Sequence, residues 1–152
     1  MQMTILDQIG YRNPEILLFI NSIILLDQKK YLAVYLLFFL VDYHLIGFTK
    51  KIIKQPRPIG FLDTKYQDGG DYTKSYGMPS GHSGLVFYST AFLWLVKKSI
   101  PILIFELSMC AITLYQRYTY KKHTIEQLIA GAFLGTTVAF FAYHTGKKIF
   151  KI

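Results

Sequence analysis

The sequence predicts an all-α integral membrane protein, a helical bundle of about five transmembrane helices, with four to six as the range. Hydrophobic residues make up 52% of the chain and charged residues only 17%, whereas ordinary soluble domains contain about 25% charged residues. The charged residues also cluster between long apolar blocks, which is typical of membrane spans. With 152 residues the chain is long enough for one compact unit, so we expect a single membrane-embedded domain over residues 1–152.

Five apolar blocks are the candidate spans. A helix needs about 20 residues to cross the hydrocarbon core, with about 17 as the lower limit. The second and fifth blocks reach this limit, the third reaches it if the sequence "PSGHS" is included, and the first and fourth are slightly short. The first block can instead lie in the membrane interface, and a soluble bundle of buried helices is the alternative to a membrane protein. The blocks are 14–27, 31–48, a third from the 79–84 region to Val96, about 100–115 and about 125–144.

Basic residues at the ends of these blocks give the chain its net charge of +8. Lysines that flank spans anchor helices at lipid headgroups, so we expect membrane lipids, and no nucleic acid, as partners. Residues 1–13 lack the basic start of a cleavable signal peptide, and the first span would then direct insertion. The single cysteine, Cys110, lies inside the fourth block, where we interpret it as a packing residue.

Short connections make neighbouring helices antiparallel, and this alternation places residues 49–83 and 116–124 on one face of the membrane. The polar loop at 59–78 lies on the same face, and long loops of this kind can cover a binding site. Its three carboxylates follow no known metal-binding spacing, so we expect no metal and no other cofactor. These carboxylates are Asp63, Asp68 and Asp71.

Two short segments on this face have residue types that suit a phosphate. The first runs from Lys50 to Arg57, where Arg presents a planar fork that grips two phosphate oxygens and Lys adds a mobile charge. The second is Ser80-Gly81-His82, after Pro79. Ser caps a helix, Gly allows close backbone approach, the amides of a helix start attract anions, and His can donate a proton to a departing oxygen. The alternatives are a basic membrane-flanking cluster and a simple capping turn.

A third segment, from Arg117 to His123, joins the fourth and fifth blocks. Together the three segments resemble the motifs of the type 2 phosphatidic acid phosphatase superfamily: Lys-x6-Arg-Pro, then Pro-Ser-Gly-His, then Ser-Arg-x5-His-x3-Asp. The first two motifs match in full, and the third departs twice, with Gln116 in place of Ser and Gln127 in place of Asp. The ordered triple is specific and spans residues 50–127, about half of the chain.

The resemblance implies a reaction at the membrane surface without a metal ion. His123 would attack phosphorus to form a phosphohistidine, His82 would protonate the leaving oxygen, and water activated by His82 would then release phosphate. Positive charges and helix amides would stabilise the transition state. The residues that would hold the phosphate oxygens are Lys50, Arg57, Ser80, Gly81 and Arg117.

Gln127 lies four residues after His123 and therefore faces the same side of a helix. We expect it to act with the catalytic histidines, because its side-chain oxygen can set the tautomer and orientation of His123, although it lacks the negative charge of Asp. Glu126 is the alternative orienting group. The same stripe continues through Gly131 and Gly135, a spacing that predicts close packing against a neighbouring span.

The sequences "HTIEQLIAG" and "GMPSGHS" are similar to the dolichyldiphosphatase branch of this superfamily, in which His-Thr-x-x-Gln replaces the Asp form. The resemblance favours a polyprenyl diphosphate, cleaved to the monophosphate and inorganic phosphate. Phosphatidic acid or another lipid phosphate is the alternative substrate. An inactive relative that binds lipid phosphates is the alternative function, and a pore or transporter is a third.

The distribution of lysines does not decide the orientation, because both faces carry similar positive charge. The resemblance places the active site on the lumenal or extracytoplasmic side. The membrane would be the endoplasmic reticulum or another internal membrane if the source is eukaryotic or viral, and the plasma membrane if it is bacterial. The sequence leaves the oligomeric state open.

Overall fold

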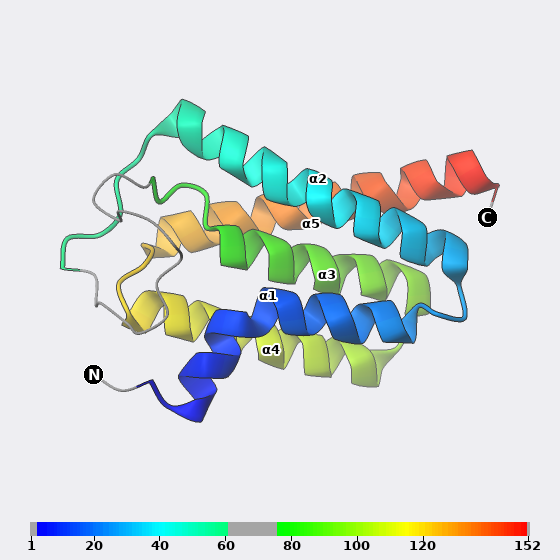
Figure 1. Cartoon of the computed structure of the whole chain (residues 1–152), viewed down its shortest axis with the longest axis horizontal. Helices are drawn as coiled ribbons and strands as arrows, with labels where there is room; N and C mark the ends of the chain where they lie inside the picture. The colour runs from blue at the N-terminus through cyan, green and yellow to red at the C-terminus, as the bar shows by residue number, and fades with distance from the viewer. Residues whose placement is uncertain (1–2, 61–75, 152) are drawn as a thin grey trace.

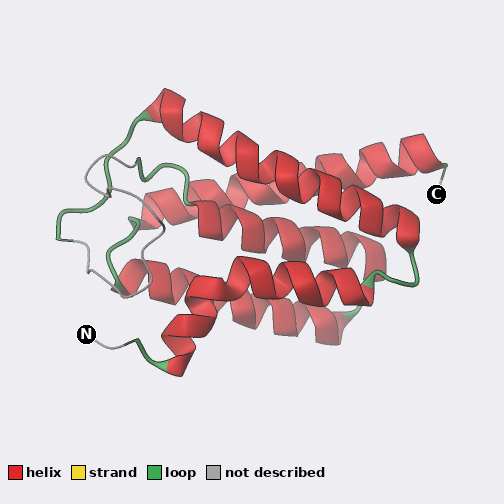
Figure 2. Ribbon diagram, in the orientation of Figure 1, coloured by secondary structure: helices red, strands yellow, loops and turns green. Residues whose placement is uncertain are grey.

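Five helices lie side by side in an up-and-down bundle in the computed structural model (Figure 1). The structure describes residues 3–60 and 76–151, and within these ranges it contains helices and their connecting loops only (Figure 2). The all-α architecture that the sequence predicts is therefore confirmed. The helices are α1 (Ile5–Ile24), α2 (Lys29–Ile53), α3 (Gly81–Lys97), α4 (Ile100–Thr119) and α5 (Ile125–Phe150).

Three of these helices, α2, α4 and α5, are long and apolar enough to cross a membrane. Large apolar side chains on the outside of the bundle are exposed, among them Leu37, Ile104 and Phe133. Exposed apolar surface on this scale suits contact with lipid rather than water. The chain is thus an integral membrane helical bundle. The central helix α3 has 17 residues and is surrounded by the other four.

The first helix begins much earlier than predicted. We expected it to start at residue 14, but α1 begins at Ile5 because Thr4 caps it: the Thr4 side chain accepts from the Asp7 amide, and the Asp7 carboxylate accepts from the Thr4 amide at 2.9 Å. Pro14 lies inside the helix. It has no N–H and its ring crowds the preceding turn, and Figure 1 shows the first turns of α1 bent away from the rest.

The other helices also differ from the apolar blocks at their ends. Helices α2, α4 and α5 continue past residues 48, 115 and 144, where the predicted blocks stop. Their last turns contain lysine, arginine and polar residues, and Lys and Arg are good helix formers. Hydropathy marks the part of a helix that lies in lipid, whereas the backbone stays helical until a residue such as Lys54 takes the left-handed conformation.

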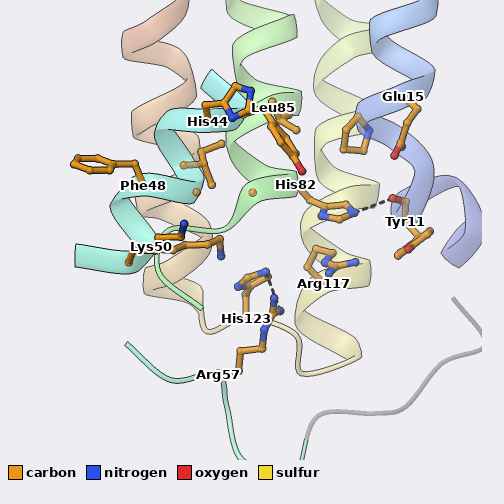
Figure 3. Close-up of a pocket in the computed structure, with 16 residues that line it drawn as sticks. Tyr11, Glu15, His44, Phe48, Lys50, Arg57, His82, Leu85, Arg117 and His123 are labelled. Carbon is orange, nitrogen blue, oxygen red and sulfur yellow. Dashed lines mark hydrogen bonds between the residues drawn. The ribbon is translucent and has the colours of Figure 1, made fainter. Parts of the chain in front are cut away.

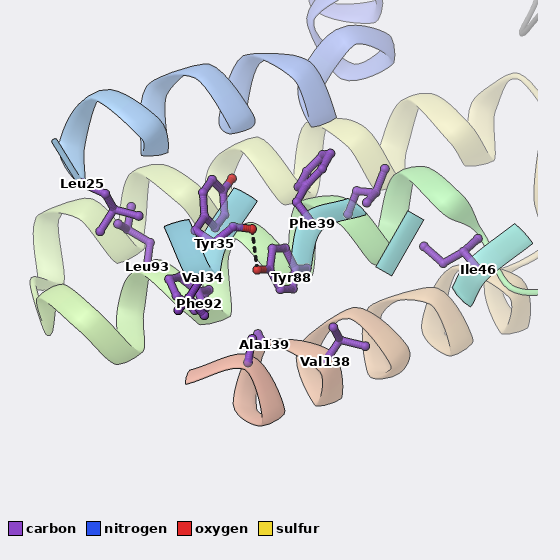
Figure 4. Close-up of a cluster of buried hydrophobic side chains, with 12 residues drawn as sticks. Leu25, Val34, Tyr35, Phe39, Ile46, Tyr88, Phe92, Leu93, Val138 and Ala139 are labelled. Carbon is purple, nitrogen blue, oxygen red and sulfur yellow. Dashed lines mark hydrogen bonds between the residues drawn. The ribbon is translucent and has the colours of Figure 1, made fainter. Parts of the chain in front are cut away.

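Helices α3 and α5 pack most closely, and glycines make this possible. A Cβ at Gly131 would meet the carbonyl oxygen of Ser80, and a Cβ at Gly135 would meet that of Gly84. The predicted packing stripe of α5 is therefore confirmed, with α3 as the partner. Further along the bundle, aromatic side chains of α2 and α3 form a buried cluster against α5 (Figure 4), in which the Tyr88 hydroxyl donates to the Tyr35 carbonyl at 2.9 Å.

The three motif segments come together at one end of the bundle. The chain after α2, the start of α3 and the α4–α5 connection lie at this end, and the α1–α2 and α3–α4 connections lie at the other (Figure 1). This confirms the predicted sidedness. Most of the polar loop predicted at 59–78, including its three aspartates, lies outside the described residues, so its role as a cover stays a prediction.

Candidate active site

A cavity of about 630 Å³ opens at this end of the bundle and brings the motif residues together (Figure 3). Its lining combines three histidines with four positively charged side chains and one carboxylate, Glu15. Such a cavity is suited to an anion with several oxygens. The predicted site residues that line it are Lys50, Arg57, Gly81, His82, Arg117 and His123.

His123 is 3% exposed and lies in the loop before α5. Its Nδ1 atom is 3.0 Å from the carbonyl oxygen of Gly77 and 3.2 Å from the side-chain oxygen of Gln127. Because a carbonyl oxygen can only accept, Nδ1 carries the hydrogen, and the Nε2 atom keeps its lone pair. Nε2 is the nitrogen that can attack.

Arg57 stands next to this lone pair. Its Nη1 atom is 3.4 Å from Nε2 of His123 and donates to the carbonyl oxygen of Lys122 at 2.9 Å. The guanidinium is thereby attached to the loop that carries His123. Lys50, at the end of α2, donates to the carbonyl oxygen of Tyr76 at 3.0 Å. A phosphate held by Arg57 would lie close to Nε2 of His123.

Burial holds the pKa of His123 well below its ordinary value of 6.5, and the positive charges of Arg117, Arg57 and Lys50 lower it further. His123 is therefore neutral near pH 7. A neutral imidazole has the nucleophilic lone pair that an imidazolium lacks. Burial and the neighbouring cations thus keep the lone pair on Nε2 available.

Gln127 lies behind His123 and is fully buried. Its side-chain oxygen faces Nδ1 of His123, as the sequence predicts, and also accepts from the Thr124 amide at 3.3 Å. Its backbone oxygen accepts from the Ser80 amide at 2.9 Å. Gln127 therefore connects the second and third motifs. Glu126, the alternative orienting group, is exposed.

His82 and Arg117 are both held by Tyr11 of α1. His82 Nε2 is 3.0 Å from the carbonyl oxygen of Tyr11, so this nitrogen also carries a hydrogen. The guanidinium of Arg117 lies 5.7 Å from the centre of the Tyr11 ring, a cation–π distance. Helix α1 thus contributes to a site that the sequence motifs place on the later helices.

Ser80 and Gly81 have different positions at the start of α3. Ser80 is fully buried, caps the helix by accepting from the Ser83 amide at 3.4 Å, and is not among the residues that line the cavity. Gly81 does line it and stands at the first position of the helix, where amides have no acceptor within the helix. The structure therefore places the helix start, rather than the Ser80 hydroxyl, at the cavity wall.

Gln116, the first departure from the third motif, lies between helices α4 and α1. Gln116 is 1% exposed, and its side chain lies so close to Gly10 of α1 that a Cβ on Gly10 would come within 2.8 Å of it. The side chain fills space between α4 and α1, and it does not line the cavity. The neighbouring Arg117 still points into the cavity.

Away from His82 and His123 the cavity continues along α1, α2 and α3, where apolar residues line it together with His44 and Glu15. Pro14, Tyr43, Gly47 and Leu85 are among the residues that line it, and Figure 3 shows this region beside the charged groups. One cavity therefore offers positive charge at the membrane face and an apolar wall toward the membrane interior.

Three contributors to the site were missed by the sequence motifs: Tyr11, Gln55 and Gly77. Gln55 accepts from the Gln127 side chain at 3.0 Å, and its backbone oxygen accepts from the Gly77 amide at 2.7 Å. Gly77 acts through its backbone carbonyl, which leaves no residue-type signal, and Tyr11 acts through its carbonyl and through the ring that lies against Arg117. For Gln55 a signal existed, since a buried amide at 127 needs acceptors for its two hydrogens.

The charges in the cavity favour an anionic ligand over a metal ion. Among residues 3–60 and 76–151, no group of three or more His, Cys, Asp and Glu side chains lies together. Lys50, Arg57 and Arg117 would repel a cation from the space in front of His123.

The fold and the site define an integral membrane protein in which the motif residues Lys50, Arg57, His82, Arg117 and His123 share one cavity at one end of the bundle. Residues 31–151 match the PAP2 superfamily, and the chain belongs to this superfamily. It is 30% identical over 113 residues to Dolichyldiphosphatase 1 of Dictyostelium discoideum, a match that covers 67% of this chain and 46% of that protein. The chain thus spans about half the length of this relative. No solved structure gave a significant match.

Proposed function

We propose that this protein is a lipid phosphatase that hydrolyses the terminal phosphate of a polyprenyl diphosphate through a phosphohistidine on His123, without a cofactor. The observation that carries the proposal is the distance of 3.4 Å between Nε2 of His123 and Nη1 of Arg57. It puts a buried, neutral nucleophile beside the group best suited to grip a phosphate. The similarity to Dolichyldiphosphatase 1 supports the diphosphate as substrate.

The first step transfers the phosphoryl group. Nε2 of His123 forms a bond to the terminal phosphorus, and the bond from this phosphorus to the bridging oxygen breaks. His82 keeps its Nε2–H on the Tyr11 carbonyl and gives a proton from Nδ1 to the bridging oxygen, which leaves on the lipid monophosphate. Lys50, Arg57 and Arg117 balance the charge on the other oxygens of the phosphoryl group.

The second step releases phosphate. His82, now without the proton it gave away, takes one from water, and the water oxygen attacks the phosphorus while the bond to His123 breaks. Inorganic phosphate leaves and both histidines return to their starting states. Ser80 supports both steps indirectly, because its cap holds the start of α3 and with it the Gly81 amide at the cavity wall.

The cavity shape supports a lipid substrate. A diphosphate at the charged part would leave its chain against Pro14, Gly47 and Leu85, between the helices and toward the lipid. We place the site on the lumenal or extracytoplasmic side of the membrane by analogy with the superfamily.

The test is phosphate release by purified protein in detergent with a chelator present. Polyprenyl diphosphate, phosphatidic acid and phosphatidylglycerol phosphate are offered in parallel. We expect polyprenyl diphosphate to be preferred and His123→Ala to lower its turnover by about 10⁴-fold or more. His82→Ala should also be severely impaired. His144→Ala is the matched control, since His144 is an exposed histidine on α5 that does not line the cavity.

Other results would change the conclusion in defined ways. A preference for phosphatidic acid would keep the mechanism and replace the substrate. Equal release by wild type, His123→Ala and His82→Ala would overturn the mechanism. Binding of all three lipids without turnover would identify an inactive lipid-phosphate-binding protein instead.

A further inference from the structure

We propose that Gln55 is a positioning residue that acts on the nucleophile through Gln127. Gln55 is an unassigned residue inside the first motif, between Lys50 and Arg57. Its side-chain oxygen accepts from the side-chain NH₂ group of Gln127 at 3.0 Å. The side-chain oxygen of Gln127 in turn faces Nδ1 of His123 at 3.2 Å. The inference rests on the proposed function, because it assigns Gln55 a role in the reaction of His123.

The orientation of the Gln127 side chain follows from its partners. Its amide nitrogen is 2.9 Å from the carbonyl oxygen of Pro56, which can only accept. The NH₂ group must therefore point to Pro56 and Gln55, and the oxygen must point to His123 and the Thr124 amide. Gln55 supplies the acceptor for the second hydrogen, which would otherwise be buried without a partner.

This arrangement accounts for the departure from Asp at position 127. A carboxylate there has no hydrogen to give to the carbonyl oxygen of Pro56 or to the side-chain oxygen of Gln55. An amide matches these two acceptors with two donors and still presents an oxygen to His123. The residue at 127 and the acceptors at 55 and 56 thus form one hydrogen-bonded unit.

Gln55 also acts on the other acceptor of the nucleophile. Its backbone oxygen accepts from the Gly77 amide at 2.7 Å, and the Gly77 carbonyl accepts from Nδ1 of His123 at 3.0 Å. One residue thereby connects to both groups that hold the His123 ring, through its side chain to Gln127 and through its main chain to Gly77. A side-chain substitution tests the first connection and leaves the second in place.

The experiment compares Gln55→Leu, Gln55→Glu, Gln127→Leu and the double variant Gln55→Leu/Gln127→Leu, with polyprenyl diphosphate as substrate. Gln55→Leu should lower kcat by about tenfold, the loss expected for one hydrogen bond, and change KM by less than about twofold. Gln55→Glu keeps an acceptor and should restore most of the kcat. The double variant should be no slower than Gln127→Leu alone, because both changes remove the same connection.

A readout that does not depend on activity completes the test. In NMR spectra of the protein in detergent, the Gln127 side-chain hydrogens should exchange slowly with solvent in wild type and Gln55→Glu. In Gln55→Leu one of them should exchange faster. Unchanged exchange, unchanged kcat, or losses that multiply in the double variant would each overturn the role of Gln55. If the Gln127 side-chain hydrogens of the wild type exchange slowly but the protein shows no turnover, the proposed function would be overturned. The hydrogen bond between Gln127 and Gln55 would still stand.

Discussion

The carbonyl oxygen of Gly77 lies 3.0 Å from Nδ1 of His123 and fixes the tautomer of this ring. A backbone carbonyl cannot donate, so the hydrogen must be on Nδ1 whichever residue stands at position 127. In the superfamily motif an Asp orients the histidine and also adds negative charge. Here Gly77 and Gln127 both present an oxygen to Nδ1 of His123, and neither carries a negative charge.

Gly77 is expected to tolerate no side chain. A Cβ at this position would approach Cδ of Gln127 to 2.6 Å, so Gly77→Ala must displace either the Gln127 amide or its own carbonyl. Misplacement of a catalytic group by about 1 Å costs about 10²-fold in rate, and we expect a loss of kcat of this order. Steady-state kinetics with polyprenyl diphosphate measure it, and thermal unfolding shows whether the variant is folded. Wild-type kcat in a folded Gly77→Ala protein would contradict the prediction.

The lowered pKa of His123 predicts how stability and charge state depend on pH. Unfolded His123 binds a proton below about pH 6.5, whereas the folded ring stays neutral to a lower pH because of burial and the nearby cations. Its contribution to the free energy of unfolding is therefore fully present above pH 6.5 and decreases as the pH falls below it.

The cationic contribution to this pKa is measurable by substitution. Arg117→Gln removes one of the positive charges and should raise the pKa of His123 toward 6.5. A titration of the His123 ring followed by NMR gives the two pKa values directly, without need of turnover. Identical values in wild type and Arg117→Gln would show that Arg117 does not contribute to the lowered pKa of His123.

The fold could be predicted because long apolar blocks in the sequence mark the helices that lie in lipid. Block order and short connections were enough to place the three motif segments at one end. The start of α1 was missed because its first turns are polar and Pro14 resembles a helix start. The signal that decides the boundary is local, a capping box between Thr4 and Asp7, and hydropathy does not contain it.

Only the residues that contribute to the site through their side chains could be predicted from the sequence. Two cationic side chains and a histidine are residue types that indicate a phosphate site. These residues, Lys50, Arg57 and His123, line one cavity. The carbonyls of Tyr11 and Gly77 could not be found in this way, since every residue has a carbonyl and only the fold decides where it points.

The apolar wall of the cavity predicts a substitution that separates lipid from soluble substrates. Gly47 lines the cavity and a Cβ there would meet nothing within 4 Å, so we expect the ring of Gly47→Phe to occupy part of the cavity. We expect KM for polyprenyl diphosphate to rise about tenfold or more, because the lipid chain loses apolar contacts with the cavity wall. Hydrolysis of a short, water-soluble prenyl diphosphate should change little. An equal effect on both substrates would place the lipid chain elsewhere.

Gly135 tests the contact between α3 and α5. A Cβ there would collide with the carbonyl oxygen of Gly84 and come within 3.0 Å of its Cα atom, so Gly135→Val must push the two helices apart. Overpacking of this kind costs about 1–3 kcal/mol, and the free energy of unfolding should fall by that amount. The single tryptophan, Trp94 on α3, allows unfolding in mixed micelles to be followed by fluorescence. Thr137→Val is the matched control, since Thr137 is exposed on the same helix, and it should leave the stability nearly unchanged. Equal stabilities of the two variants would mean that the close approach of α3 and α5 does not contribute to the fold.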